Sequence, residues 1–155
     1  MEITILIFLF GGLFLGWSLG ANDAANVFGT AVGTRMVSFT SAAIVCSIFV
    51  ILGAIISGAG TTETLGKLGA INALPGAFAA CVAAGVSVYL MTKVGLPVST
   101  TQAIVGAIVG WNLYTGSSTN IQVLMTILAT WIICPIIAGI IAMGLFTFTK
   151  KVILN

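Results

Sequence analysis

The composition of this 155-residue chain excludes a soluble domain. Hydrophobic residues make up 59% of the sequence, charged residues only 5%, and histidine is absent. A soluble domain carries about 25% charged residues to keep its surface in water, so this chain uses lipid as its solvent. The net charge of +2 is too small to indicate a nucleic-acid partner. We expect an all-α polytopic membrane protein without a soluble domain, in which residues 1–155 form a single transmembrane unit.

The apolar runs predict about five membrane segments, because about 20 helical residues cross the hydrocarbon core. The first run is too long for one straight span, so we predict a backbone break at Gly20. A polar, glycine-rich stretch over 58–72 is predicted to be a loop. Whether 95–116 crosses the membrane or re-enters it stays open. The predicted segments are 3–19 resuming as 24–34, 39–57, 75–93, 95–116 and 120–149.

The positive charges are few but ordered along the chain. If all five segments cross, one side carries Arg35, Lys93, Lys150 and Lys151. The positive-inside rule makes that side the cytoplasm. We therefore expect a plasma-membrane protein with its N-terminus outside and the C-terminus of this chain in the cytoplasm. An odd number of crossings would invert a second copy of the unit, as in many secondary transporters.

Small residues recur at a spacing of four, which lets helices approach closely in lipid. We expect ordinary helix packing at most of these glycines, and a backbone break at Gly20 and Gly95, which adjoin polar clusters. The spaced glycines are Gly12, Gly16, Gly20, Gly29, Gly33, Gly106 and Gly110.

An acid and two asparagines, Asn22, Asp23 and Asn26, interrupt the first apolar run. An acid at membrane depth costs about 3 kcal/mol, so a solvated cavity or a bound cation must compensate. Carboxylate and amide oxygens suit a hard cation such as Na⁺, whereas amide donors and a helix start near Ala24 suit an anion. The competing interpretation is an N-cap by Asp23, which does not account for the two asparagines.

Three hydroxyls and an amide form a second polar cluster at the start of a predicted helix: Ser99, Thr100, Thr101 and Gln102. Gly95 and Pro97 favour extended chain before them. Free backbone N–H groups, the helix dipole and hydroxyl donors together suit an anion. An ordinary capping role is the competing interpretation. Two polar helix starts in one small membrane unit are typical of the discontinuous helices that mark binding sites in transporters.

The two clusters resemble the two signatures of the inorganic phosphate transporter family. Gly20–Asn26 is similar to its glycine-alanine-asparagine-aspartate signature, Pro97–Thr101 is similar to its second signature, and Ala103–Gly110 continues the likeness. The resemblance implies a cation-coupled phosphate symporter built from two inverted halves. It implies sodium coordination by Asn22, Asp23 and Asn26, and phosphate binding by these residues with Ser99, Thr100, Thr101 and Gln102.

The sequence departs from the family in two ways. Many members have histidine where this chain has Gln102, and glutamine cannot titrate near neutrality, which disfavours a proton relay there. One copy of each signature corresponds to half of the family's chain. We therefore expect a second half, in the same native chain or a separate one, and a dimer of whole transporters.

The leading interpretation is the N-terminal half of a sodium-coupled phosphate symporter, with no cofactor besides the coupling ion and no enzymatic activity. Proton coupling is an alternative, and arsenate or sulfate are alternative substrates. A subunit of an ion channel is a further alternative, because Thr30–Thr34 faintly resembles a potassium filter. An intramembrane enzyme ranks last, because a hydroxyl nucleophile would lack a histidine base.

Overall fold

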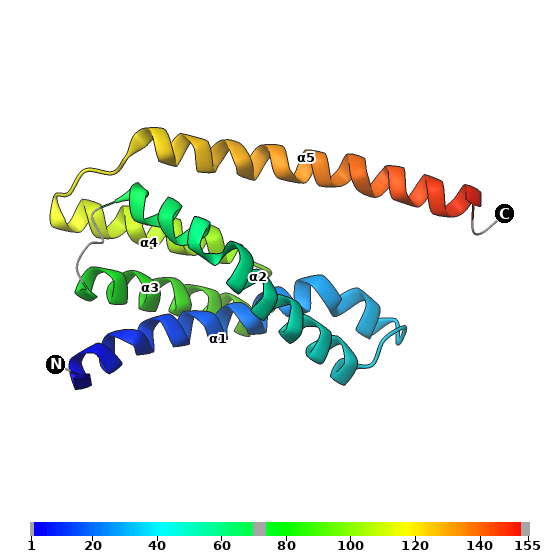
Figure 1. Ribbon diagram of the computed structural model, residues 1–155, viewed down its shortest axis with the longest axis horizontal. Helices are drawn as coiled ribbons and strands as arrows, with labels where there is room; N and C mark the ends of the chain where they lie inside the picture. Colours follow the sequence, from blue (N-terminus) through cyan, green and yellow to red (C-terminus); the bar gives the residue numbers. More distant parts are fainter. Residues whose placement is uncertain (1, 70–73, 153–155) are drawn as a thin grey trace. The chain divides into compact units, whose positions relative to one another are not determined.

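The computed structural model describes residues 2–69 and 74–152, which form five helices and no strand (Figure 1). Four of these helices, α1, α2, α3 and α5, are long and apolar enough to cross a membrane. The predicted all-α membrane fold is confirmed. Residues 1–119 and 120–155 form two compact units, which are described separately. The helices are α1 (Glu2–Gly33), α2 (Phe39–Leu68), α3 (Leu74–Lys93), α4 (Thr100–Thr115) and α5 (Ile121–Val152).

Helix α1 is continuous through the first polar cluster, so the predicted break at Gly20 is wrong. The side chains that were expected to interrupt the helix bond to other segments instead. Asn22 reaches Thr92 at the end of α3, and Asp23 accepts a hydrogen bond from Thr100 at the start of α4. The α1 backbone therefore keeps its own i→i−4 hydrogen bonds. Its 32 residues extend about 48 Å, well beyond the roughly 30 Å of hydrocarbon.

Helix α2 continues through Leu68, so the predicted loop over 58–72 is wrong as far as the structure describes it. From residue 70 onward that loop lies outside the described residues. The polar side chains of this stretch are satisfied within the helix. The hydroxyl of Thr62 donates to a carbonyl one turn earlier at 3.0 Å, and Lys67 pairs with Glu63. Local pairing of this kind lets a polar sequence remain helical.

Helices α3 and α4 pack against each other as a hairpin (Figure 1). Residues 94–99 form its non-helical tip. Gly95 there has φ +75°, in the left-handed region that glycine enters without the steric cost of a Cβ. Pro97 lies in the irregular part of the same tip. The predicted break at Gly95 and Pro97 is confirmed.

Both ends of the hairpin lie together. Near the end of α4, Asn112 is fully buried, and a Cβ built on Gly69 would collide with its amide. Gly69 closes α2 and precedes α3 in the chain. The chain therefore enters the hairpin and leaves it at the same end.

Two glycines allow α1 and α3 to pack closely, and neither belongs to the predicted series. A Cβ on Gly11 would lie 2.8 Å from the ring of Phe78, and one on Gly85 would lie 2.7 Å from the ring of Phe14. The spaced glycines make no close helix contact among the residues that the structure describes, so their expected packing stays a prediction. A Cβ on any of these would meet nothing within 4 Å: Gly12, Gly16, Gly20, Gly29, Gly33, Gly106 and Gly110.

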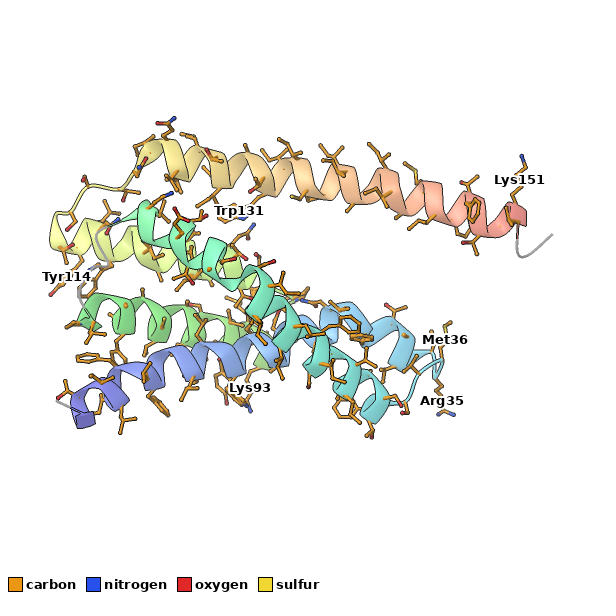
Figure 2. The ribbon with its side chains drawn as sticks, in the orientation of Figure 1. Arg35, Met36, Lys93, Tyr114, Trp131 and Lys151 are labelled. Carbon is orange, nitrogen blue, oxygen red and sulfur yellow. The ribbon has the colours of Figure 1, made fainter. Side chains whose placement is uncertain are left out.

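The tip of the hairpin reaches only part of the way along α1. Thr92, one residue before the end of α3, bonds to Asn22, and from Asn22 to Gly33 α1 rises about 16 Å further. Figure 2 shows Lys93 beside the middle of α1 and Arg35 at its far end. Lys93 and Arg35 therefore lie at different levels along α1, because α3 is much shorter than α1, and the expectation that they share one side of the membrane stays a prediction.

Helix α5, taken by itself, is a 32-residue apolar helix with Pro135 in its interior. Asn120 precedes it, and its Oδ1 accepts from the backbone N–H of Val123 at 3.1 Å, which satisfies one free donor of the first turn. Lys150 and Lys151 lie in the last turn. Their charge there is favourable for the helix dipole.

Candidate functional site

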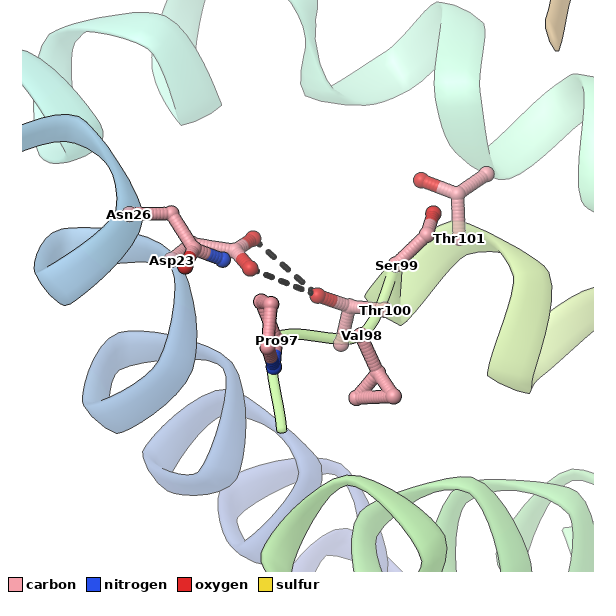
Figure 3. Close-up of a pocket in the computed structure, with 7 residues that line it drawn as sticks. All are labelled: Asp23, Asn26, Pro97, Val98, Ser99, Thr100 and Thr101. Carbon is pink, nitrogen blue, oxygen red and sulfur yellow. Dashed lines mark hydrogen bonds between the residues drawn. The ribbon is translucent and has the colours of Figure 1, made fainter. Parts of the chain in front are cut away.

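A polar pocket of about 350 Å³ lies where α1 meets the tip of the hairpin (Figure 3). Its volume falls within the range of about 300–1,000 Å³ that is typical of small-molecule sites. The two predicted polar clusters, far apart in the sequence, line this one pocket. Its lining residues are Asp23, Asn26, Pro97, Val98, Ser99, Thr100 and Thr101.

The central contact of the pocket joins Asp23 of α1 to Thr100, the first residue of α4. The Thr100 hydroxyl donates to the two carboxylate oxygens at 3.1 and 3.0 Å (Figure 3). Thr100 is buried, and Asp23 is partly exposed to the pocket. A threonine hydroxyl has one proton, so in this arrangement it is shared between the carboxylate oxygens and is not free for an anion.

The start of α4 faces the pocket with side-chain hydroxyl groups and first-turn backbone N–H groups. Ser99 is the N-cap, and its Oγ accepts from the backbone N–H of Gln102 at 3.3 Å. The expectation that these hydroxyls stand at a helix start is confirmed, since α4 begins at Thr100. Ser99 and Thr101 are exposed, and both line the pocket. The helix dipole and the free N–H groups of the first turn favour an anion at this position.

Asn22 lies beside the pocket and is 4% exposed. One end of its amide is 2.9 Å from the carbonyl oxygen of Val98 and 3.3 Å from Asp23 Oδ1, and the other end is 3.0 Å from Thr92 Oγ1. If the NH₂ group occupies the first end, it donates to both acceptors, and the amide oxygen accepts from Thr92. If the oxygen occupies the first end, it accepts from Asn26 Nδ2 at 3.1 Å, and Asn22 Nδ2 donates to Thr92.

The second orientation has a clear chemical consequence. It brings three oxygens together, from the Asn22 amide, the Asp23 carboxylate and the Val98 carbonyl. Three acceptors that face one another repel unless a cation lies between them. Neutral and anionic oxygens of this kind are the ligands that hard cations prefer. The site can therefore offer an oxygen cage for a cation next to a helix start that suits an anion.

The structure brings most of the predicted site residues together. Asp23, Asn26 and the three hydroxyl residues line the pocket, and Asn22 adjoins it. The Gln102 side chain is exposed and is not part of the lining, although its N–H takes part in the cap. Sequence reasoning missed Thr92 and the Val98 carbonyl. A hydroxyl three residues before Gly95 was a weak signal for the first, and a main-chain carbonyl has no signal in residue type.

Long apolar helices, a helical hairpin that enters and returns, and a polar pocket at its tip define the chain as part of a membrane transport protein. The chain belongs to the phosphate transporter family, whose sequence profile matches residues 19–155. The expected family resemblance is thus confirmed.

Individual relatives agree with this membership. The chain is 35% identical to a "Putative phosphate permease" of Pyrococcus furiosus over 99% of its length, and 34% identical to a protein of the same name from Haemophilus influenzae over 93%. It spans only 39% and 37% of those two relatives. A solved structure described as "The sodium-dependent phosphate transporter" is similar to this chain, with a TM-score of 0.84 and 29% sequence identity. The match covers 97% of this chain and 40% of the chain in the solved structure.

Proposed function

We propose that the protein to which this chain belongs carries inorganic phosphate across a membrane in symport with Na⁺. The observation that carries the proposal is the position of Asp23. Its carboxylate lies at the start of α4, bonded to Thr100, in a pocket where the first turn of that helix favours an anion. A carboxylate in an anion site is compatible with anion binding when a cation binds together with the anion and offsets the repulsion.

Electrostatics supply the coupling. Two unit charges of the same sign about 4 Å apart repel by about 4 kcal/mol at an effective dielectric of 20. Asp23 alone would thus weaken phosphate binding by about three orders of magnitude. A Na⁺ ion between Asp23 and phosphate removes this penalty, so each ligand binds well only in the presence of the other.

The roles proposed for the residues follow from their positions. Na⁺ takes the oxygens of Asn22, Asp23 and the Val98 carbonyl, with Asn26 supporting the Asn22 oxygen. Phosphate takes the donors at the start of α4. These are the hydroxyls of Ser99 and Thr101 and the free backbone N–H groups. Thr100 serves the carboxylate instead, and its hydroxyl becomes available to phosphate once Na⁺ has replaced it at Asp23.

The proposed membrane topology follows from the hairpin. Helices α1, α2 and α5 cross the membrane, whereas the α3–α4 hairpin enters from the side of the N-terminus and returns to it. Of the two hairpin helices, α3 is by itself long enough to span. Arg35, Lys150 and Lys151 then share one side, which the positive-inside rule assigns to the cytoplasm. Three crossings keep the number odd, so a second unit of this kind would be inverted and would add its own pocket. A complete transporter of two units, associated as a dimer, remains our expectation.

The relatives support the proposal, because they are named as phosphate permeases and the structural neighbour as sodium-dependent. The test is uptake of labelled phosphate into proteoliposomes that contain the complete native protein, with a gradient of Na⁺, of protons, or of neither. Uptake driven by the Na⁺ gradient and saturated by phosphate is expected. Uptake driven by the proton gradient alone would assign a proton symporter, and unsaturable conductance would assign a channel. Arsenate and sulfate as competitors define the substrate range.

A further inference from the structure

We propose that Thr92, at the end of α3, is the positioning residue that turns the amide oxygen of Asn22 toward the coupling cation. Thr92 does not touch the cation itself and acts through Asn22. The inference rests on the proposed function, because it assigns the group that orients one cation ligand of that site.

The Asn22 amide has two opposed sets of neighbours. At one end, the Val98 carbonyl at 2.9 Å and Asp23 Oδ1 at 3.3 Å are acceptors and favour the NH₂ group there. Asn26 Nδ2 at 3.1 Å favours the oxygen at that end. Two acceptors outweigh one donor when no cation is present. A cation between the three oxygens reverses this preference. The two orientations of the Asn22 amide are therefore close in energy, and the group that faces the second end of the amide can decide between them.

Thr92 occupies that other end. Its hydroxyl donates to the Val88 carbonyl, one helical turn earlier, at 2.8 Å, and this bond uses its single proton. The lone pairs of Thr92 Oγ1 then face Asn22 at 3.0 Å and require a donor. Among the residues that the structure describes, the Asn22 NH₂ group is the donor placed to satisfy them. While the Val88–Thr92 bond is made, it favours the orientation in which the Asn22 oxygen points toward Asp23 and Val98.

Without the cation, the same hydroxyl can rotate. It then donates to the Asn22 oxygen at 3.0 Å, and the NH₂ group of Asn22 donates to the Val98 carbonyl. The amide NH₂ and oxygen of Asn22 each have a partner in both arrangements, whereas Thr92 gives up its bond to the Val88 carbonyl in the second. The pair therefore passes between a closed form tied to the hairpin tip and an open form with an oxygen cage, without movement of either helix.

The test uses the complete native protein with Thr92→Val, Thr92→Ser and Ser87→Ala. Valine keeps the shape of threonine and loses the acceptor, whereas serine keeps the acceptor. Ser87 is the matched control, because its hydroxyl donates to the Ala83 carbonyl at 2.8 Å on the same helix but is exposed and bonds to nothing else in the part of the chain that the structure describes. Phosphate uptake is measured against Na⁺ concentration, and then against phosphate concentration at saturating Na⁺.

We expect Thr92→Val to raise the half-saturating Na⁺ concentration about tenfold, which corresponds to one net hydrogen bond. Its phosphate affinity at saturating Na⁺ should stay within about twofold of the wild type. Thr92→Ser should restore the Na⁺ dependence, and Ser87→Ala should leave it unchanged. An unaltered Na⁺ curve for Thr92→Val, or an equal loss of both affinities that serine does not rescue, would overturn the inference.

A double-mutant cycle covers the case in which Thr92→Val is poorly folded. Asn22→Asp places an oxygen at both ends of the side chain, so the orientation no longer matters. In that background Thr92→Val should cost nothing further in Na⁺ affinity, and full additivity of the two changes would overturn the inference. A wild-type protein that transports phosphate without Na⁺ would overturn the proposed function as well, whereas normal Na⁺ coupling in Thr92→Val overturns the role of Thr92 alone.

Discussion

Thr100 donates its hydroxyl to both carboxylate oxygens of Asp23, at 3.1 and 3.0 Å, across 77 positions of the sequence. The contact joins a transmembrane helix to the tip of the hairpin. It also places the charge of Asp23 at the positive end of the α4 dipole.

Replacing the charge of Asp23 should abolish Na⁺ coupling. Asp23→Asn keeps the size and an oxygen ligand but removes the unit charge, and we expect Na⁺ affinity to fall by about two to three orders of magnitude. The measurement is phosphate uptake into proteoliposomes with and without a Na⁺ gradient. Glu63→Gln is the control, since Glu63 lies on α2 in an exposed pair with Lys67. Normal Na⁺-driven uptake by Asp23→Asn would remove Asp23 from the mechanism.

The two threonines at the start of α4 should behave differently. Thr101→Val removes a donor that lines the pocket, and we expect phosphate affinity to fall by about one to two orders of magnitude, since hydrogen bonds to charged groups contribute about 1.5–3 kcal/mol. Thr100→Val removes the buried partner of Asp23, so it should change Na⁺ and phosphate affinity together. Binding of the two ligands is measured separately by calorimetry. Identical profiles for the two variants would contradict the assignment of Thr100 to the carboxylate.

Close packing of α1 on α3 predicts a stability effect at Gly85. Gly85→Ala forces a Cβ to within 2.7 Å of the Phe14 ring, and overpacking of this kind costs about 1–3 kcal/mol. We expect a lower melting temperature in detergent. Gly106→Ala is the matched control on α4, where a Cβ would meet nothing within 4 Å among the described residues. An unchanged melting temperature for Gly85→Ala would show that the contact between α1 and α3 is looser than in this structure.

The proposed re-entrant topology of the hairpin predicts an unusual depth for Lys93. A fluorophore attached to Lys93→Cys should be quenched most strongly by spin labels near the bilayer centre, and one attached to Arg35→Cys by labels at the headgroups. The variants are made after replacement of the native cysteines, which are Cys46, Cys81 and Cys134. Equal shallow depths at both positions would mean that α3 crosses the membrane completely.

Local sequence properties were enough to predict the class of the protein and most of the polar residues that line the pocket. Charge content decides between water and lipid as the solvent, and apolar runs decide the number of long helices. Gly95 and Pro97 stand close together and favour a break, because one enters the left-handed region easily and the other lacks a donor. The cost of an acid in lipid marked Asp23 for function without any knowledge of its neighbours.

Only the tertiary structure decided how these parts meet. α1 continues through Gly20 because Asn22 and Asp23 find partners on the hairpin, and no local rule can anticipate partners 70 and 77 positions away. The depth of Lys93 depends on how far α3 extends beside α1. The role of Thr92 depends on which atom of Asn22 faces it. Composition and propensity act within one helical turn, whereas the continuity of a polar helix and the orientation of an amide depend on contacts between distant segments.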